Sequence, residues 1–179
     1  FKKYGLFSFD IFKSPISGGS WVLFFSKNRN KKSISLKKLE EYEKRNKINR
    51  FVRWKRFSRE SINHLKKLKD KISYINKKLN KKMIAYGASA RSSTMLNFSS
   101  LNNQHISFII DKNKMKDRKF TPGTNIKIIS LSKCLSLIKK EKYLLILAWN
   151  FKKEIITFLK EKGFKGKFLI PLPKKMVVK

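Results

Sequence analysis

The residues best suited to bind a ligand form one run of small and hydroxyl-bearing side chains: Gly87, Ala88, Ser89, Ala90, Arg91, Ser92, Ser93 and Thr94. The run follows an apolar stretch and opens a helical pattern, where free backbone N–H groups and the helix dipole favour an anion such as a phosphate. Small side chains let a ligand approach the backbone, hydroxyls can donate to phosphate oxygens, and Arg91 supplies positive charge. The run lacks two glycines of the dinucleotide fingerprint, and an ordinary strand-to-helix turn with an N-cap is the alternative.

A carboxylate stands at a suggestive distance from this run. Asp111 ends the next apolar stretch, and positions 87 and 111 are 24 residues apart. In dinucleotide-binding folds an acidic residue roughly 20 residues after the glycine-rich turn accepts a hydrogen bond from a ribose hydroxyl. Asp111 is therefore a candidate nucleotide ligand, and the alternative is that it only caps the loop that follows.

Other reactive residues do not assemble into a recognisable site. His64 and His105 are the only histidines, and no Cys or carboxylate stands at metal-ligand spacing from them, so we expect no zinc site in this chain. The single Cys134 lies in an amphipathic pattern and is expected in the core. No Ser-His-Asp or paired-carboxylate arrangement can be placed, so the sequence predicts no catalytic residue.

From residue 83 onward, strand and helix patterns alternate. Apolar strands are expected at 83–86, 106–110, 143–148 and 167–172, helices at 88–98, 131–140 and 152–162, and a loop at 112–126. Short apolar strands separated by helices predict a Rossmann-like α/β domain of three layers, with a mostly parallel sheet covered on both faces. Ligands of such sheets lie at the carboxyl ends of the strands, which places the loops after Tyr86, Ile110 and Ala148 at the site.

The first 80 residues have a different character. Residues 6–12 and 20–26 predict a β-hairpin with a turn at 14–19. Because an isolated hairpin is only marginally stable, it is expected to complete the sheet of a domain that precedes it in the chain. Residues 34–80 lack Gly and Pro and carry one apolar stripe, which predicts a long helix packed on the domain that follows. A basic amphipathic helix for a membrane surface or a partner is the alternative. We therefore expect three parts: 1–27, the last strands of the preceding domain; 28–80, a linker and the long helix; and 81–179, the Rossmann-like domain.

The charge of this chain is extreme, at +34, with 37 Lys and only 8 Arg. Recognition of bases and phosphates favours the planar fork of Arg, so this balance argues against a basic nucleic-acid-binding protein, which we keep as a third reading. No apolar run approaches the roughly 18 to 20 residues that cross a bilayer, and nothing resembles a signal peptide. We therefore expect a cytoplasmic protein with no specific nucleic-acid partner and no membrane association.

Four segments of the sequence, taken together, resemble the motifs of a known family. They are Tyr86-Gly-Ala-Ser-Ala-Arg-Ser-Ser-Thr-Met-Leu-Asn-Phe98, Asp111-Lys-Asn113, Phe120-Thr-Pro-Gly-Thr-Asn-Ile126 and Leu145-Ile-Leu-Ala-Trp-Asn150. The C-terminal domain of the nucleotide-sugar C-methyltransferases typically shows YGAxAKGNTxLN, DxNPxKxG, PGTxIPI and LAWN segments in this order. The resemblance covers about residues 50 to 172. Beside the first run and Asp111, it implies these substrate-binding residues: Lys116, Gly123, Thr124, Trp149 and Asn150.

The family resemblance also implies an activity and a division of labour. Its members carry an N-terminal zinc-binding domain, a middle domain that binds S-adenosylmethionine, and this C-terminal domain. They methylate a carbon of a keto-deoxysugar linked to a nucleoside diphosphate, through an enolate formed by a base of the middle domain. Phe9-Asp10 and Ser17–Ser20 look like the last stretch of that middle domain. The resemblance thus places zinc, S-adenosylmethionine and the catalytic base upstream, and this chain alone is expected to be inactive.

The sequence also departs from the family pattern. Ser17 replaces His, Arg91-Ser-Ser93 replaces Lys-Gly-Asn, Lys114 replaces Pro, and Asn125 replaces a common His. The loss of Gly at position 92 is expected to change the backbone conformation allowed there, since Gly alone reaches positive φ cheaply. A nucleotide- or dinucleotide-binding regulatory module without catalysis is the alternative function.

Overall fold

The computed structural model describes residues 1–16, 19–172 and 177–178, with side chains described as far as residue 172. Ser17, where the family has His, lies outside the described residues. The chain divides into two compact units, Phe1–Glu60 and Ser61–Lys179. In the described part of the chain, no helix is long and apolar enough to cross a membrane.

The first unit is built on the predicted hairpin. Strands β1 (Phe7–Ser14) and β2 (Ser20–Ser26) pair antiparallel, after a short 3₁₀ helix η1 (Lys2–Tyr4) and before α1 (Ile34–Arg45). Ser33 caps α1, because its hydroxyl accepts a hydrogen bond from the Leu36 N–H at 3.2 Å. The backbone N–H of Ser33 donates to Phe9 O at 2.8 Å, and this bond joins the start of α1 to β1.

The single helix predicted over 34–80 is wrong in one respect, because the structure breaks it into α1 and α2 (Phe51–Leu79). Lys47 adopts a left-handed φ of 52°, and the Ile48 N–H returns to Glu43 O at 3.0 Å. This is the bond that closes a Schellman-type helix end. Glycine usually occupies the left-handed position, so a sequence with Lys there gave no sign of the break.

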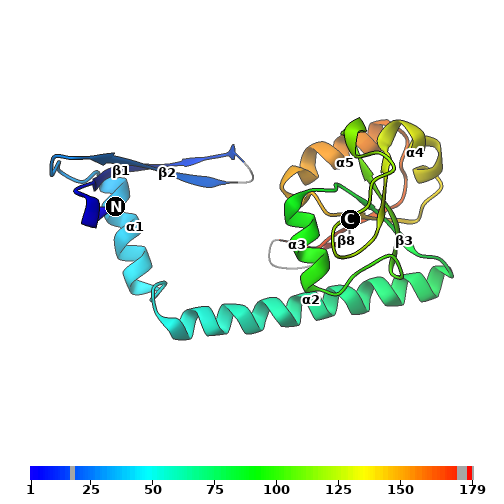
Figure 1. Cartoon of the computed structure of the whole chain (residues 1–179), viewed down its shortest axis with the longest axis horizontal. Coiled ribbons are helices and arrows are strands. Elements are labelled where there is room, and N and C mark those ends of the chain that lie inside the picture. The colour runs from blue at the N-terminus through cyan, green and yellow to red at the C-terminus, as the bar shows by residue number, and fades with distance from the viewer. Residues whose placement is uncertain (17–18, 173–176, 179) are drawn as a thin grey trace. The chain divides into compact units, whose positions relative to one another are not determined.

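The second unit contains the predicted parallel sheet. Its strand order is β5-β4-β3-β6-β7-β8, in which the first five strands run parallel and β8 pairs antiparallel with β7. Figure 1 labels β3 and β8 of this sheet, together with the helices α3, α4 and α5 of the same unit. The strands are β3 (Met83–Tyr86), β4 (Ile106–Asp111), β5 (Lys127–Ser130), β6 (Tyr143–Ile146), β7 (Lys167–Ile170) and β8 (Val177–Val178). Between them lie α3 (Ala90–Phe98), η3 (Lys114–Lys116), α4 (Leu131–Ile138), η4 (Trp149–Phe151) and α5 (Lys152–Glu161). The Rossmann-like α/β fold is confirmed, whereas β5 and β8 had not been expected.

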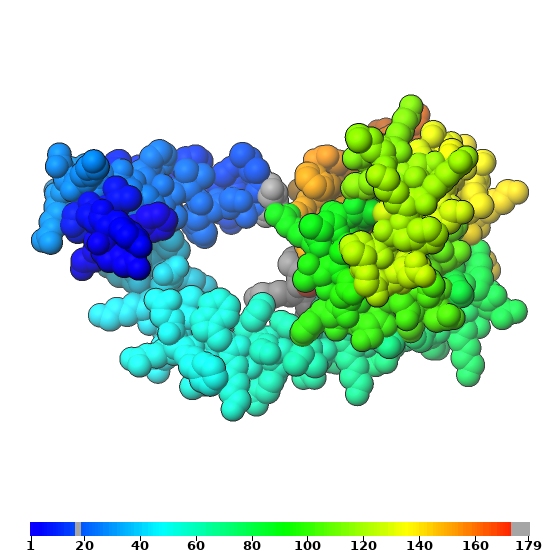
Figure 2. Space-filling model, in the orientation of Figure 1, coloured from blue at the N-terminus to red at the C-terminus, as the bar shows by residue number. Residues whose placement is uncertain are grey.

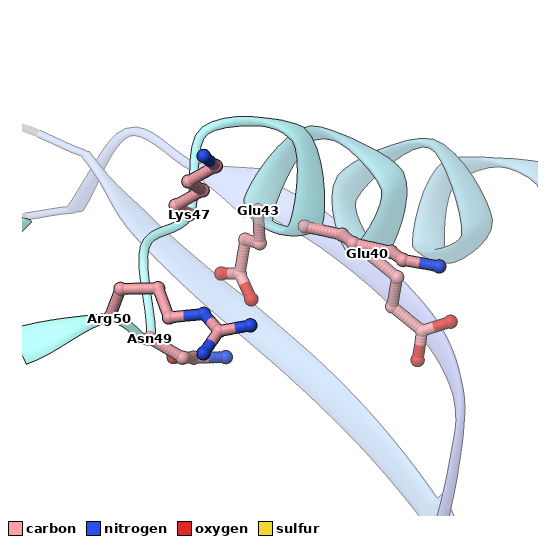
Figure 3. Close-up of a pocket in the computed structure, with 6 residues that line it drawn as sticks. Glu40, Glu43, Lys47, Asn49 and Arg50 are labelled. Atoms are coloured by element: carbon pink, nitrogen blue, oxygen red, sulfur yellow. The ribbon is translucent and has the colours of Figure 1, made fainter.

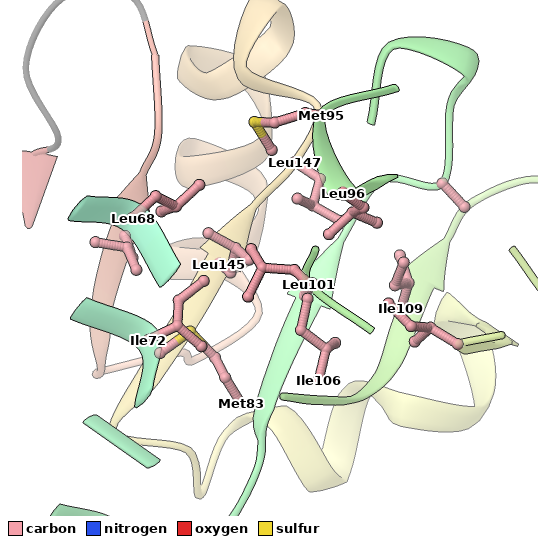
Figure 4. Close-up of a cluster of buried hydrophobic side chains, with 14 of the residues drawn as sticks. Leu68, Ile72, Met83, Met95, Leu96, Leu101, Ile106, Ile109, Leu145 and Leu147 are labelled. Carbon is pink, nitrogen blue, oxygen red and sulfur yellow. The ribbon is translucent and has the colours of Figure 1, made fainter. Parts of the chain in front are cut away.

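Helices cover both faces of this sheet. On one face, Met83 and Ala85 of β3 pack with Leu68 and Ile72 of α2 and with Leu96 of α3 (Figure 4). The other face has a second core, formed by side chains of β3, β4, β6 and β7 with α4 and α5. Cys134 is buried in this second core, as its pattern predicted. The alternation of β3 side chains between the two cores is what a strand buried on both sides requires.

Candidate functional site

The loops that follow β3, β4 and β6 meet at the carboxyl edge of the sheet, where the sequence placed the ligand. The Gly87 N–H donates to Ile110 O at 2.8 Å, and the Leu147 N–H donates to Tyr86 O at 2.9 Å. These bonds extend the pairing of the strands by one residue and hold the three loops together. A ligand at this edge would therefore touch residues from several distant parts of the sequence.

Gly87 is required by its neighbour in the fold. Its φ is 100°, and a Cβ built there would lie 2.5 Å from the Ala148 Cβ and 2.9 Å from the Ala148 N. The loop after β6 therefore passes directly against the backbone of Gly87. Close approach explains this glycine, as the sequence suggested, but the group that approaches is Ala148 of the same chain.

The start of α3 is locked by a reciprocal cap between two serines. The Ser92 N–H donates to the Ser89 hydroxyl at 3.2 Å, and the Ser89 N–H donates to the Ser92 hydroxyl at 2.6 Å. Ser92 is fully buried and helical, and its φ is not positive, so the conformation at this position does not require a glycine. Its hydroxyl serves the cap.

Two backbone amides remain for an anion at this helix end. The amides of Ala90 and Arg91 have no acceptor in the described part of the chain, and both residues are exposed. The Arg91 side chain forms no ion pair with a described carboxylate, and the exposed Thr94 donates its hydroxyl to Ala90 O at 3.1 Å. Together with the exposed Ser89 and the half-buried Ser93, these groups make a small donor surface.

Asp111 and Lys116 hold the first loop in place. Asp111 Oδ2 accepts from the Ala88 N–H at 2.8 Å, and its Oδ1 accepts from the Asn113 N–H at 2.8 Å. The Lys116 ammonium donates to Ala88 O at 2.6 Å and lies 3.2 Å from Asp111 Oδ2. The Asp111 side chain is only 13% exposed. Both predicted ligand residues therefore lie at the site, and both bind the Gly87 loop.

The Thr121–Thr124 turn packs against α3. Thr124 is buried, and its hydroxyl lies 2.6 Å from that of Thr121, which also accepts the Ile126 N–H at 2.9 Å. The Asn97 side-chain amide donates to Pro122 O at 3.0 Å and so joins the turn to the helix. Gly123 is exposed with a φ of 76°, and a Cβ there would collide with the Asn97 amide. The buried Thr124 hydroxyl thus stabilises the turn through Thr121, and Gly123 forms the exposed backbone of the turn.

The last two predicted residues follow β6. Trp149 and Asn150 belong to η4 and are both half-buried. Trp149 packs against both cores of the second unit, so its ring fixes the loop at the edge of the sheet. Lys112 and Lys114 are exposed on the neighbouring loop after β4. They leave this edge with an excess of positive charge that would favour an anionic ligand.

Tyr86 was missed among the candidates, although it ends β3. The residue is 3% exposed, and its hydroxyl has no hydrogen-bond partner among the described residues. Burial, and to a smaller extent the charge of Asp111, raise the pKa of Tyr86 to about 12. A tyrosine at the end of a buried strand is the signal that could have drawn attention to it. It packs in the core shared with α4 and α5, on the face away from α3.

Cavities in the first unit do not coincide with this edge. One of about 510 Å³ lies at the end of α1 and is lined by Glu40, Glu43, Lys44, Lys47, Asn49 and Arg50 (Figure 3). Its mixed charges give no single preference for an anion or a cation. Within the described residues, no three His, Cys, Asp or Glu side chains group together as a metal site would require.

Comparisons with known proteins agree on one family. The family described as "C-methyltransferase C-terminal domain" matches residues 15–173. The C-methyltransferase NovU of Streptomyces niveus is 35% identical over 101 residues, which are 55% of this chain and 23% of that protein. The chain therefore spans about a quarter of the length of that relative.

Proposed function

The chain belongs to the family of C-methyltransferase C-terminal domains, and from this premise we propose that it holds the substrate of a C-methyltransferase. The substrate class is a keto-deoxysugar linked to a nucleoside diphosphate. Its anionic diphosphate or nucleoside contacts the carboxyl edge of the sheet, while the sugar faces the methyl donor carried by the preceding part of the polypeptide. The name of the relative supports methyl transfer to carbon. The sugar nucleotide is the substrate class that the family resemblance implies.

The observation that carries this proposal is the donor surface at the start of α3. The amides of Ala90 and Arg91 point from a helix N-terminus, where the dipole favours negative charge. Arg91 stands beside them with an exposed guanidinium that forms no ion pair in the described chain. A diphosphate offers several acceptor oxygens to such a surface. The exposed Lys112 and Lys114 increase the local positive potential.

The remaining candidate residues position this surface. Lys116 and Asp111 fix the Ala88 peptide from both its N–H and its carbonyl side. Thr124 and the backbone of Gly123 form a turn that Asn97 fastens to α3. Through these bonds the loops after β3 and β4 keep one arrangement, so a ligand meets donors that are already ordered.

The S-adenosylmethionine site is placed elsewhere because the family resemblance assigns that cofactor to the middle domain. At this edge, Asp111 uses both carboxylate oxygens to hold the backbone of its own chain, so its main role here is to order the loops. We therefore assign the cofactor, and the base that removes a proton from the sugar, to the polypeptide preceding residue 1. The hairpin β1–β2 would complete the sheet of that part.

Methyl transfer by the complete polypeptide tests the proposal. The full-length enzyme, given S-adenosylmethionine and a nucleoside-diphosphate keto-deoxysugar, should yield a sugar nucleotide heavier by one methylene group in mass spectrometry. Residues 1–179 alone should yield none and should show no heat of binding with S-adenosylmethionine. Stoichiometric binding of that cofactor to residues 1–179 would contradict the assignment of its site upstream.

A further inference from the structure

The helix α2 carries one apolar stripe of which only the second half is covered. Residues on the stripe recur at steps that keep them on one side of a helix: Trp54, Phe57, Leu65, Leu68, Ile72, Ile75 and Leu79. Leu68, Ile72 and Ile75 are buried in the core of the second unit. Trp54 and Phe57 are 56% and 60% exposed, although they continue the same line. The start of the stripe thus lacks the cover that its end has.

The exposed part is an aromatic surface. Trp54 and Phe57 meet edge to face with ring centroids 6.0 Å apart, and Phe51 and Val52 beside them are also exposed. The surface of this helix in residues 51–60 is drawn in cyan in Figure 2. Aromatic side chains that cluster on one helix face are typical of protein interfaces. We call Phe51, Trp54 and Phe57, with Arg50 and Arg53, the aromatic–arginine face.

Arginine is concentrated in the segment that carries this face. Five of the eight arginines in the chain fall within residues 45–59: Arg45, Arg50, Arg53, Arg56 and Arg59. Arg50 and Arg53 stand one helical turn before Trp54 and Phe57, and neither forms an ion pair with a described carboxylate. A general excess of lysine does not explain why the arginines gather here. Arg and aromatic residues together are the side chains enriched at interface hot spots.

We propose that the aromatic–arginine face docks on an apolar, acidic-rimmed surface of the polypeptide that precedes this chain in the complete enzyme. The relative NovU extends far beyond the matched region, which is 23% of its length, so a homologous enzyme has ample chain to supply the partner surface. The charge of the face requires carboxylates opposite Arg50 and Arg53. This contact goes beyond the proposed substrate site, although both rest on the presence of preceding domains.

Two other occupants fit the observations less well. A second copy of the same helix would bring arginines against arginines, since residues 44–59 carry eight basic and no acidic side chains. A phosphate surface, whether lipid or RNA, would meet the carboxylate of Glu60, which follows this segment directly. Glu60 moreover holds Arg56 in an ion pair of 2.7 Å. A protein surface can match such mixed charges locally.

Hydrogen–deuterium exchange compares the face in the complete enzyme and in residues 1–179. Amides of residues 51–60 should exchange at least tenfold more slowly in the complete enzyme, whereas those of residues 68–79, already covered, should not change. Trp54→Ala combined with Phe57→Ala should abolish this difference, as should Arg50→Glu combined with Arg53→Glu. Tyr74→Ala removes an equally exposed aromatic ring outside the stripe and should leave the protection intact.

Four outcomes would overturn the proposal. The first is that the amides of positions 51–60 exchange equally fast in both proteins. The second is that, in the isolated 1–179 chain, their protection rises with protein concentration. The third and fourth are that phosphatidylserine vesicles, or RNA, protect them in the isolated chain. Methyl transfer is measured separately on the same samples. Its absence with protection retained would count against the substrate proposal and leave the docking proposal standing.

Discussion

The ammonium of Lys116 lies 3.2 Å from Asp111 Oδ2 and donates to Ala88 O at 2.6 Å, so the loop after β4 holds the loop after β3. The same carboxylate oxygen accepts the Ala88 N–H. Asp111 and Lys116, which the sequence analysis predicts to bind a ligand, are thus hydrogen-bonded to the backbone of Ala88. The donors left for the ligand are those that this bridge orders, namely the amides at the start of α3 and the Arg91 side chain.

Asp111→Asn should lower the free energy of unfolding by about 1–3 kcal/mol. An amide can replace only one carboxylate oxygen, so its NH₂ group would face a donor at either Asn113 or the Ala88–Lys116 pair. Urea denaturation of residues 1–179 measures the change. Asp70→Asn, at an exposed position of α2, is the matched control and should cost less than about 0.5 kcal/mol. Equal values for the two variants would count against the bridge.

Gly87→Ala should destabilise the protein by about 3 kcal/mol or more. The left-handed conformation itself costs roughly 1–2 kcal/mol with a side chain, and the clash with Ala148 adds to it. Gly163→Ala has a similar φ of 89° but meets only the flexible Lys139 side chain, no closer than 3.5 Å. Chemical denaturation of both variants separates the two contributions. If Gly163→Ala is as damaging as Gly87→Ala, the close approach of Ala148 is not what demands glycine.

Ser92→Gly restores the family residue and should cost about 1 kcal/mol more than Ser93→Gly. Both changes place a glycine in the first turn of α3, but only Ser92 completes the reciprocal cap with Ser89. Thermal and urea unfolding of the two variants provide the comparison. A Ser92→Gly protein as stable as the parent would show that the cap adds nothing here.

Tyr86→Phe should leave the stability at pH 7 unchanged or raise it by up to about 1–3 kcal/mol, because the buried hydroxyl has no described partner. The pKa of Tyr86 is raised in the folded state from its ordinary value of 10 to about 12. Folding therefore favours the protonated phenol. The stability that the protonated Tyr86 contributes is fully present below pH 10 and is lost as the pH rises toward 12.

Urea unfolding of Tyr86→Phe and the parent between pH 8 and 12 checks this sign. The variant should gain stability relative to the parent above pH 10. Parallel pH profiles would show that the pKa of Tyr86 is not raised by folding. A variant that loses more than about 1 kcal/mol at pH 7 would indicate a hydrogen bond to the hydroxyl.

The strands and helices of the second unit were largely predictable, because their apolar runs are separated by clear polar turns. The strand β5 was not, since Lys127–Ser130 is short and passes directly into α4 without a turn. The break after α1 depends on Lys47 in a left-handed conformation, which the residue type does not announce. Tertiary contacts determine where β5 forms and where α1 ends, and the local conformational preferences of the residues do not indicate either.

The position of the candidate site was predictable, whereas the role of each residue was not. Parallel strands bring their carboxyl ends to one edge, so the order of strands and helices sufficed to bring Gly87, Asp111 and Trp149 together. Whether Asp111 accepts from a ribose or from the Ala88 amide depends on the local geometry of the loop, which the residue types do not determine. The burial of Ser92 and Thr124 likewise follows from packing, because a hydroxyl in a turn can face either way.

We propose that the start of α3 binds the anionic part of a nucleoside-diphosphate keto-deoxysugar. Titration calorimetry of the complete enzyme with that ligand tests this binding most directly. Arg91→Ala should weaken binding about ten- to a hundredfold, since a charge-assisted hydrogen bond is worth roughly 1.5–3 kcal/mol and each 1.4 kcal/mol is a factor of ten. Arg45→Ala, an exposed arginine of α1, should bind like the parent. Unchanged affinity in Arg91→Ala, with its fold intact by circular dichroism, would contradict the claim.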